Sequence, residues 1–191
     1  PLVGGELARA FLQSGFEAEG QETLRKYHQL ITRKNETFLW YFPDGTESSV
    51  DTSTSPDATP TDGWGSSSML YGLIEGLAGV QDQAKHFQSV KLAPRWAAAE
   101  VTDAEVSVAY QSSGKQLQYQ YEESPERVSL KVESESAQLN GEVLIPADRT
   151  TKSVLQDGNR IEFTEAQIGE SRCTCFQAKF KGGSEFELQL D

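Results

Sequence analysis

Trp64 stands close to three serines, Ser66, Ser67 and Ser68, at the beginning of a segment with helical spacing. The start of a helix presents unpaired backbone N–H groups and a partial positive charge to whatever lies in front of it. An aromatic ring and hydroxyl groups beside such donors suit a sugar, which offers an apolar face for stacking and hydroxyls for hydrogen bonds. Asp62 or Ser66 is expected to be the N-cap residue of this helix. In the structural alternative, Trp64 packs under a loop and the three serines only cap the helix. Composition alone leaves both interpretations open.

Residues 62–80 are predicted to form one buried helix that carries this tip. Its apolar residues recur at spacings of three and four, at Met69, Leu70, Leu73, Ile74, Leu77 and Val80. Gly72, Gly76 and Gly79 lie on the same helix, and each glycine costs up to about 1 kcal/mol of helix propensity relative to alanine. Such a cost is tolerated where neighbouring helices approach closely, which predicts a position deep inside a larger helical assembly. We expect Glu75 to be structural and to need a partner such as an arginine.

The remaining sequence divides into a helical part and a strand part. Helices are expected from Gly5 to Ser14 and from Ala18 to Arg33, joined as an antiparallel hairpin. The Ser-, Thr-, Asp- and Pro-rich segment 48–61 is expected to be a loop, either a linker or the lining of a site. After Trp96 the apolar pattern changes to a period of two. Strands are expected at 101–110, 117–121, 128–132, 137–145, 152–155, 160–163, 174–180 and 186–190, with turns at 113–114, 140–141, 157–159 and 181–183.

This pattern predicts an α+β chain with a boundary after residue 96, in which residues 97–191 form an antiparallel β-sandwich. The net charge is −12, and no cluster of Lys and Arg stands out, so we expect neither nucleic-acid nor membrane binding. Cys173 and Cys175 have no partner histidines nearby, so we expect reduced structural cysteines, no metal site and no cofactor. The chain begins at Pro1 and shows no basic segment followed by an apolar one, so we expect any signal peptide to be absent or removed. The location stays open, and the acidic, cysteine-poor composition favours a periplasmic or extracellular protein over a cytoplasmic one.

Four pieces of sequence occur in an order found in a known enzyme group. They are Leu39-Trp-Tyr-Phe-Pro-Asp-Gly45, Tyr71-Gly72, Leu77-Ala-Gly-Val80 and Phe87-Gln-Ser-Val-Lys-Leu-Ala-Pro94. The region from Thr37 to Trp96 resembles the end of the catalytic domain of six-hairpin glycosidases, and most of all the α-L-rhamnosidase group. The resemblance implies that residues 1–96 are the C-terminal end of an (α/α)6 toroid, made of a helical hairpin and the last inner helix. It also implies that 97–191 are the β-sandwich domain that follows.

The resemblance further implies a function. The chain would be the C-terminal portion of a glycoside hydrolase that cleaves a plant- or microbe-derived glycan, with an α-L-rhamnoside as one candidate, by an inverting mechanism with two carboxylates. The general acid would come from toroid helices outside the chain, so we expect the chain alone to be inactive. Its partners would be a glycoside or oligosaccharide substrate and the upstream part of the same toroid. The alternatives are a noncatalytic carbohydrate-binding protein and an accessory structural protein.

Two residues depart from the motif of the group. Tyr41 stands where the rhamnosidase loop has an acid that we take to be the general base, and a tyrosine, with an ordinary pKa near 10, is a poor base at neutral pH. Ser68 stands where the motif has a histidine that contacts the sugar. The candidate bases in this chain are Asp44, Glu47 and Asp62, and the candidate substrate-binding residues are Trp40, Tyr41, Trp64, Ser67 and Ser68.

Overall fold

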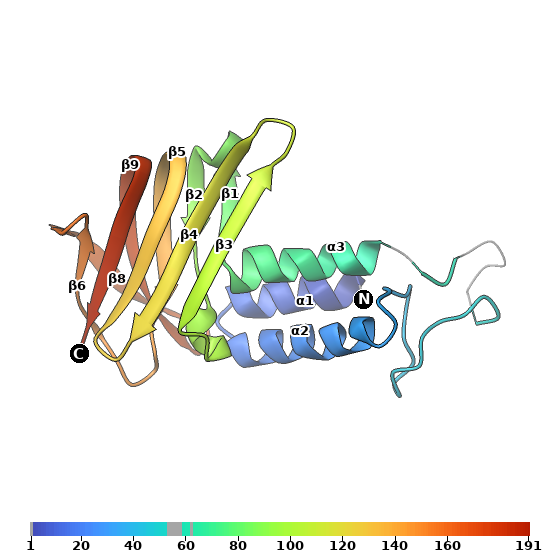
Figure 1. The fold of residues 1–191 in the computed structure, drawn as a ribbon. Coiled ribbons are helices and arrows are strands. Elements are labelled where there is room, and N and C mark those ends of the chain that lie inside the picture. Colours follow the sequence, from blue (N-terminus) through green and yellow to red (C-terminus); the bar gives the residue numbers. More distant parts are fainter. Residues whose placement is uncertain (1, 53–58, 62) are drawn as a thin grey trace. The chain divides into compact units, whose positions relative to one another are not determined.

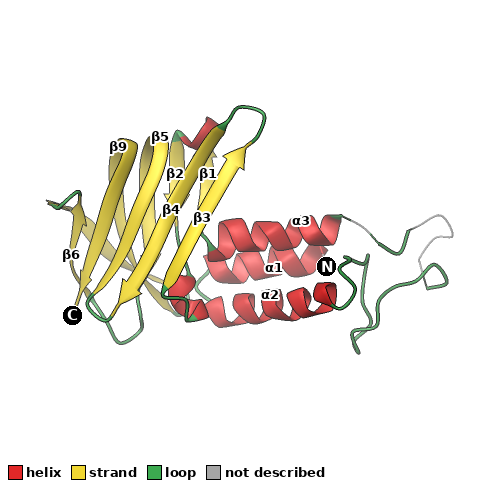
Figure 2. Cartoon of the chain, in the orientation of Figure 1, coloured by secondary structure: helices red, strands yellow, loops and turns green. Residues whose placement is uncertain are grey.

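The structure is a computed structural model that describes residues 2–52, 59–61 and 63–191. The chain forms two compact units, Pro1–Gly76 and Leu77–Asp191. The first is helical and the second is built of strands, as the sequence predicts (Figure 2). The division between the compact units falls after Gly76, because the segment that follows forms two strands that pair within the second unit. The expected domain boundary after residue 96 stays a prediction. Among the described helices, none is both long enough and apolar enough to cross a bilayer.

Two helices form the expected hairpin in the first unit. Helix α1 runs over Leu2–Gln13 and helix α2 over Glu17–Thr32, and they lie side by side (Figure 1). The chain turns between them at Gly15, whose φ of +78° lies in the left-handed region that glycine enters at little cost. Gly20 of α2 allows the close approach, since a Cβ atom there would lie 2.6 Å from the Leu12 Cγ atom of α1.

The predicted helix over 62–80 is confirmed for most of its length, with one change of type. Helix α3 runs over Trp64–Tyr71 and continues as a π-helix, η1, over Gly72–Leu77. The predicted close packing at the glycines is confirmed, because a Cβ at Gly72 would lie 2.9 Å from Leu24 Cδ2 and one at Gly76 would lie 2.7 Å from Leu12 Cδ1. The expectation that the helix reaches Val80 is wrong, because Gly79 takes a φ of +69° and Val80 begins a strand.

The second unit contains one sheet, of nine strands in the part of the chain that the structure describes. The strands are β1 Val80–Ala84, β2 Ser89–Leu92, β3 Asp103–Tyr110, β4 Lys115–Ser124, β5 Arg127–Leu144, β6 Thr151–Gln156, β7 Asn159–Ile161, β8 Phe163–Ile168 and β9 Ser171–Leu190. Short 3-10 helices lie at Lys85–Phe87 and Trp96–Ala99. The strand order is β1-β2-β5-β9-β6-β7, and β3 pairs with β4, β4 with β5 and β8 with β9.

Two long strands, β5 and β9, run through both layers of this unit (Figure 1). The first half of β5 pairs with β4 and with the second half of β9, which also pairs with β6. The second half of β5 pairs with β2 and with the first half of β9, which also pairs with β8. Side chains from the two halves of β9 meet in the core, where the rings of Phe176 and Phe186 lie 5.3 Å apart. The expected sandwich is therefore one sheet folded over on itself.

Three details of the strand prediction are corrected. The β2–β5 pair is parallel, whereas the other pairs are antiparallel as expected. The expected turn at Asn140-Gly141 lies inside β5, because Gly141 leaves room for the Phe176 ring, which a Cβ atom would approach to 2.5 Å. The expected turn at 181–183 lies inside β9, where Gly182, with a φ of +84°, pairs with Ser134 at the irregular register of β5.

Candidate functional site

The segment that resembles the rhamnosidase loop forms a small β-hairpin in the first unit. Tyr41 and Glu47 are antiparallel bridge partners, and the backbone N–H of Ser48 donates to the Trp40 carbonyl oxygen at 3.0 Å. Asp44 and Gly45 occupy the tip, where the Gly45 N–H donates to the Phe42 carbonyl oxygen at 2.9 Å and Gly45 has a φ of +83°. The Pro-Asp-Gly sequence thus acts as the turn, which is the typical role of these residues.

Aromatic rings anchor the hairpin to helix α2. The ring of Tyr41 packs edge-on against Tyr27 of α2 at 6.4 Å and against Phe38 at 5.9 Å between ring centroids. Trp40 packs instead against Phe42, with ring centroids 4.5 Å apart. The indole N–H of Trp40 is buried and has no hydrogen-bond acceptor among the residues described. Tyr41 therefore serves the local fold.

The candidate bases differ in their surroundings. Asp44 is exposed at the tip, and its Oδ1 atom accepts a hydrogen bond from the Thr46 backbone N–H at 2.9 Å, which lowers the pKa of the carboxyl group. Glu47 is partly buried and forms an ion pair with Lys34, just beyond the end of α2. Asp62 lies outside the described residues. The structure therefore places one of the candidate acids, Glu47, on the hairpin directly opposite Tyr41.

The long segment after the hairpin returns to it. The Leu39 N–H donates to the Pro60 carbonyl oxygen at 2.8 Å, the Ser48 hydroxyl donates to the same oxygen at 3.0 Å, and Phe38 is a bridge partner of Thr61. The part of the predicted loop at 53–58 lies outside the described residues. These contacts hold the two ends of the segment next to the hairpin, just before α3 begins.

The tip of α3 presents only some of the expected side chains. Trp64 is 65% exposed and Ser67 is exposed, and both lie on one face of the helix because they are three residues apart. The Ser67 hydroxyl donates to the Gly63 carbonyl oxygen at 2.9 Å. Ser68 is buried and its hydroxyl donates to the Leu2 carbonyl oxygen of α1 at 2.6 Å. Ser68 thus fastens α3 to α1 in this structure.

The helix cap also differs from expectation. Gly63 is the N-cap residue of α3, and no side chain of the described residues caps it. Ser66 is the third residue of the helix, and its hydroxyl donates back to the Gly63 carbonyl oxygen at 2.9 Å. The prediction of Ser66 as N-cap is therefore wrong, because the helix begins two residues earlier.

A hollow of about 450 Å³ lies between the end of α2, the start of the hairpin and the tip of α3. Its lining residues are Ile31, Asn35, Glu36, Thr37, Thr61 and Ser66. Asn35 adopts a φ of +56°, the left-handed conformation that asparagine tolerates, and this turns the chain out of α2. Glu36 supplies a carboxylate that the sequence analysis missed. Glu36 could have been identified as a candidate from its position in the sequence, between the end of the predicted helix and the Leu39-Trp40 motif.

Glu75 has the structural role that we expected. Its Oε2 atom accepts a hydrogen bond from Arg9 Nη1 of α1 at 2.7 Å, which supplies the predicted arginine partner.

Both cysteines, Cys173 and Cys175, are free thiols. In the described ranges, no group of three or more histidine, cysteine, aspartate or glutamate residues is arranged to hold a metal ion.

Comparisons with known proteins support a fold similarity. A scan against models of known families finds no match, and neither does a search of curated proteins. An α-L-rhamnosidase of Streptomyces avermitilis, solved with L-rhamnose, aligns over 93% of this chain and 16% of its own, with 16% identity and a TM-score of 0.55. An α-L-rhamnosidase of Dictyoglumus thermophilum aligns over 72% of this chain and 15% of its own, with 16% identity and a TM-score of 0.44.

A GH127 β-L-arabinofuranosidase of Geobacillus stearothermophilus T6 aligns over 66% of this chain and 18% of its own, with 13% identity and a TM-score of 0.40. The chain therefore spans less than a fifth of the length of each of these structures. We base the fold comparison on the Streptomyces enzyme, because its TM-score exceeds 0.5. The fold of the chain is similar to that of a part of this enzyme.

Proposed function

We propose that the chain is the C-terminal portion of an inverting glycoside hydrolase that cleaves a plant- or microbe-derived glycan, with an α-L-rhamnoside as the first substrate to test. The observation that carries the proposal is the joint placement of three features: the hairpin with the rhamnosidase-like motif, the exposed ring of Trp64, and a hollow lined by residues that flank them, among them Thr37 before the hairpin and Ser66 of α3. An aromatic platform beside a polar hollow is a common arrangement for a sugar. The fold similarity over nearly the whole chain supports the same conclusion.

Exposed apolar side chains on the helices support a larger toroid as the partner. Val3 of α1 is 77% exposed, Leu70 of α3 is 55% exposed, and Leu2, Leu7 and Tyr71 also face solvent. A helix with apolar residues around most of its circumference is normally buried on all sides. We propose that upstream helices of the same toroid cover these faces and supply the general acid.

Glu47 is our candidate for the general base. Tyr41 holds the position at which the rhamnosidase motif has its acid, and Glu47 is its direct partner across the hairpin. The Cβ atoms of such partners lie about 4.5–5.5 Å apart and their side chains leave the same face of the hairpin. Glu47 can therefore bring a carboxylate to the region that a side chain at position 41 would reach. Both carboxylates have partners, Lys34 for Glu47 and the Thr46 N–H for Asp44, but Asp44 is the weaker candidate because it is exposed at the tip and is not the bridge partner of Tyr41.

Hydrolysis of 4-nitrophenyl α-L-rhamnopyranoside by the whole polypeptide tests this proposal. General bases contribute about 100- to 10,000-fold to rate, so we expect Glu47→Gln to lower kcat by at least about 100-fold. Asp44→Asn is the matched control and should change kcat by less than about threefold. Proton NMR of the released sugar should show the anomer opposite to that of the substrate. Full activity of Glu47→Gln would exclude Glu47 as base, and turnover by residues 1–191 alone would contradict the need for upstream helices.

The second candidate function is noncatalytic carbohydrate binding, which the exposed Trp64 ring favours. Quenching of tryptophan fluorescence by oligosaccharides would report such binding, and Trp64→Ala should abolish the quenching. Trp96→Phe serves as the control, because Trp96 lies in the second unit. Binding without hydrolysis by the whole polypeptide would favour this function over the enzyme.

A further inference from the structure

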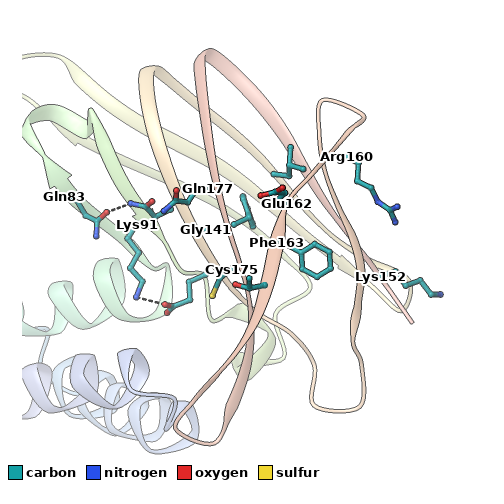
Figure 3. Close-up of a pocket in the computed structure, with 14 residues that line it drawn as sticks. Gln83, Lys91, Gly141, Lys152, Arg160, Glu162, Phe163, Cys175 and Gln177 are labelled. Carbon is teal, nitrogen blue, oxygen red and sulfur yellow. Dashed lines mark hydrogen bonds and ion pairs between the residues drawn. The ribbon is translucent and has the colours of Figure 1, made fainter.

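The second unit contains a hollow of about 1400 Å³ that the function proposed above does not use (Figure 3). Residues from β2, β5, β8 and β9 form its floor, and residues from β6 and β7 contribute to its wall. All of its lining residues belong to the second unit. The volume exceeds the range of about 300–1,000 Å³ that is typical of sites for one small molecule. A chain of several linked groups fits it better than a single small ligand.

Polar side chains cross the floor in a row. Lys91 of β2 is paired in register with Asn140 of β5, which is paired in register with Gln177 of β9. These three residues alternate with buried neighbours, so their side chains leave the outer face of the sheet and point into the hollow. Gln83, next to the end of β1, adds another amide. A row of amides offers paired donors and acceptors, the pattern that the hydroxyl groups of a sugar require.

Hydrogen bonds hold part of this row in place. The Asn140 amide donates to Gln83 Oε1 at 2.7 Å (Figure 3). Glu142 accepts from Lys91 through Oε2 at 2.8 Å and from Arg95 through Oε1 at 2.7 Å. Arg95 is only 1% exposed and also donates to the Glu142 carbonyl oxygen at 2.8 Å. A buried arginine that fixes Glu142 from below keeps this part of the floor rigid, which reduces the entropy that binding would cost.

The charges around the hollow favour a neutral ligand. Lys91 is paired with Glu142, and Lys152 on the wall is paired with Asp191 at 2.8 Å. Arg160 and Glu162 also line the hollow and have opposite charges. The second unit is acidic overall, so it would repel a polyanion such as nucleic acid. Phe163 supplies an aromatic ring on which an apolar sugar face can stack (Figure 3).

We propose that this hollow binds a neutral oligosaccharide, with Asn140 and Gln177 as its main polar contacts. The site would hold a glycan chain on the second unit independently of cleavage. It does not depend on the function proposed above, because none of its residues belongs to the first unit.

Titration of the 15N-labelled 191-residue chain tests the proposal by NMR. The probes are cellohexaose, xylohexaose, mannohexaose and arabinohexaose, with hexagalacturonate as the charged comparison. We expect at least one neutral probe to shift the amide signals of Lys91, Asn140 and Gln177 at concentrations below about 10 mM. Asn140→Ala and Gln177→Ala should each weaken binding about fivefold, the effect of one lost hydrogen bond. Gln116→Ala, which removes an exposed amide of β4, is the matched control and should leave binding unchanged.

Three results would overturn the proposal. One is the absence of shifts with every neutral probe. Another is binding of hexagalacturonate alone, lost in Arg160→Gln, which would assign the hollow to an acidic glycan. The third is a set of shifts confined to the first unit, which would place binding near Trp64. Because the shifts are mapped on the unmodified chain, a variant that fails to fold does not affect the conclusion.

Discussion

Replacement of Gly5 by alanine tests whether glycine is needed for the close approach of α1 and α3. A Cβ atom at Gly5 would lie 2.3 Å from the Ser68 hydroxyl oxygen and 2.4 Å from the Ser68 carbonyl carbon. The carbonyl carbon belongs to the backbone, so relief requires the two helices to separate. Separation would also break the bond from the Ser68 hydroxyl to the Leu2 carbonyl oxygen.

The opposing contributions give the size of the effect. Alanine is favoured over glycine within a helix by about 0.8–1.0 kcal/mol. Overpacking costs about 1–3 kcal/mol, and loss of the Ser68 hydrogen bond costs about 1 kcal/mol more. We therefore expect Gly5→Ala to lower the free energy of unfolding of the first unit by about 1–3 kcal/mol.

The neighbouring residue supplies the control. A Cβ atom at Gly4 would have no other atom within 4 Å, so Gly4→Ala should gain the helix propensity alone and stabilise the unit by up to about 1 kcal/mol. Urea unfolding followed by circular dichroism at 222 nm measures both variants, because the helices lie in the first unit. If Gly5→Ala were as stable as Gly4→Ala, the close contact between α1 and α3 would be refuted.

Three further predictions concern the second unit. Burial raises the pKa of Tyr119 and of Tyr121, so their contribution to stability is present below their ordinary pKa near 10 and is lost as the pH rises above it. The free energy of unfolding, followed by near-ultraviolet circular dichroism, should therefore fall above about pH 10. The fall should be smaller in Tyr119→Phe. Glu142→Gln leaves the charge of Arg95 buried and should cost about 3–5 kcal/mol in urea unfolding, more than the double variant Arg95→Met/Glu142→Leu. Burial also raises the pKa of the Cys175 thiol, so alkylation by iodoacetamide at about pH 8 should be slow until the unit unfolds.

Each of these predictions has a contradicting result. An unchanged alkaline transition in Tyr119→Phe would show that its burial does not couple to stability. A neutral effect of Glu142→Gln would mean that water or another group compensates Arg95. Rapid alkylation of the folded chain would show that the Cys175 thiol is accessible and ionised.

The sequence predicted the helices well because their signals are local. The spacing of apolar residues and the glycines at 72 and 76 identified a closely packed helix, and the structure confirms it. The start of that helix was less predictable, because Ser66 is a good capping residue by type but Gly63 occupies the N-cap position. The propensity of single residues for the N-cap position does not decide which of several neighbouring residues begins the helix.

The errors in the strand part arise from contacts between distant residues. Asn140-Gly141 is a strong turn signal by type, but the ring of Phe176 requires glycine in the middle of a strand. Strands β1 and β2 are too short to show a clear period of two in the sequence. Strand β2 forms because it pairs in parallel with β5, which lies far along the chain. In the candidate site, the bridge between Tyr41 and Glu47 and the hollow beside Glu36 depend on how the hairpin folds back.

The shared strands β5 and β9 have a consequence for how the second unit comes apart. Since both strands pass from one layer into the other at the irregular register near Ser134 and Gly182, neither layer can lose its order while the other keeps its central pair. We expect the unit to melt in a single cooperative step, without a half-folded intermediate. The second unit should fold more slowly than the helical hairpin, because β5 pairs with β9, which lies far along the chain, and pairing across a long sequence separation is slow.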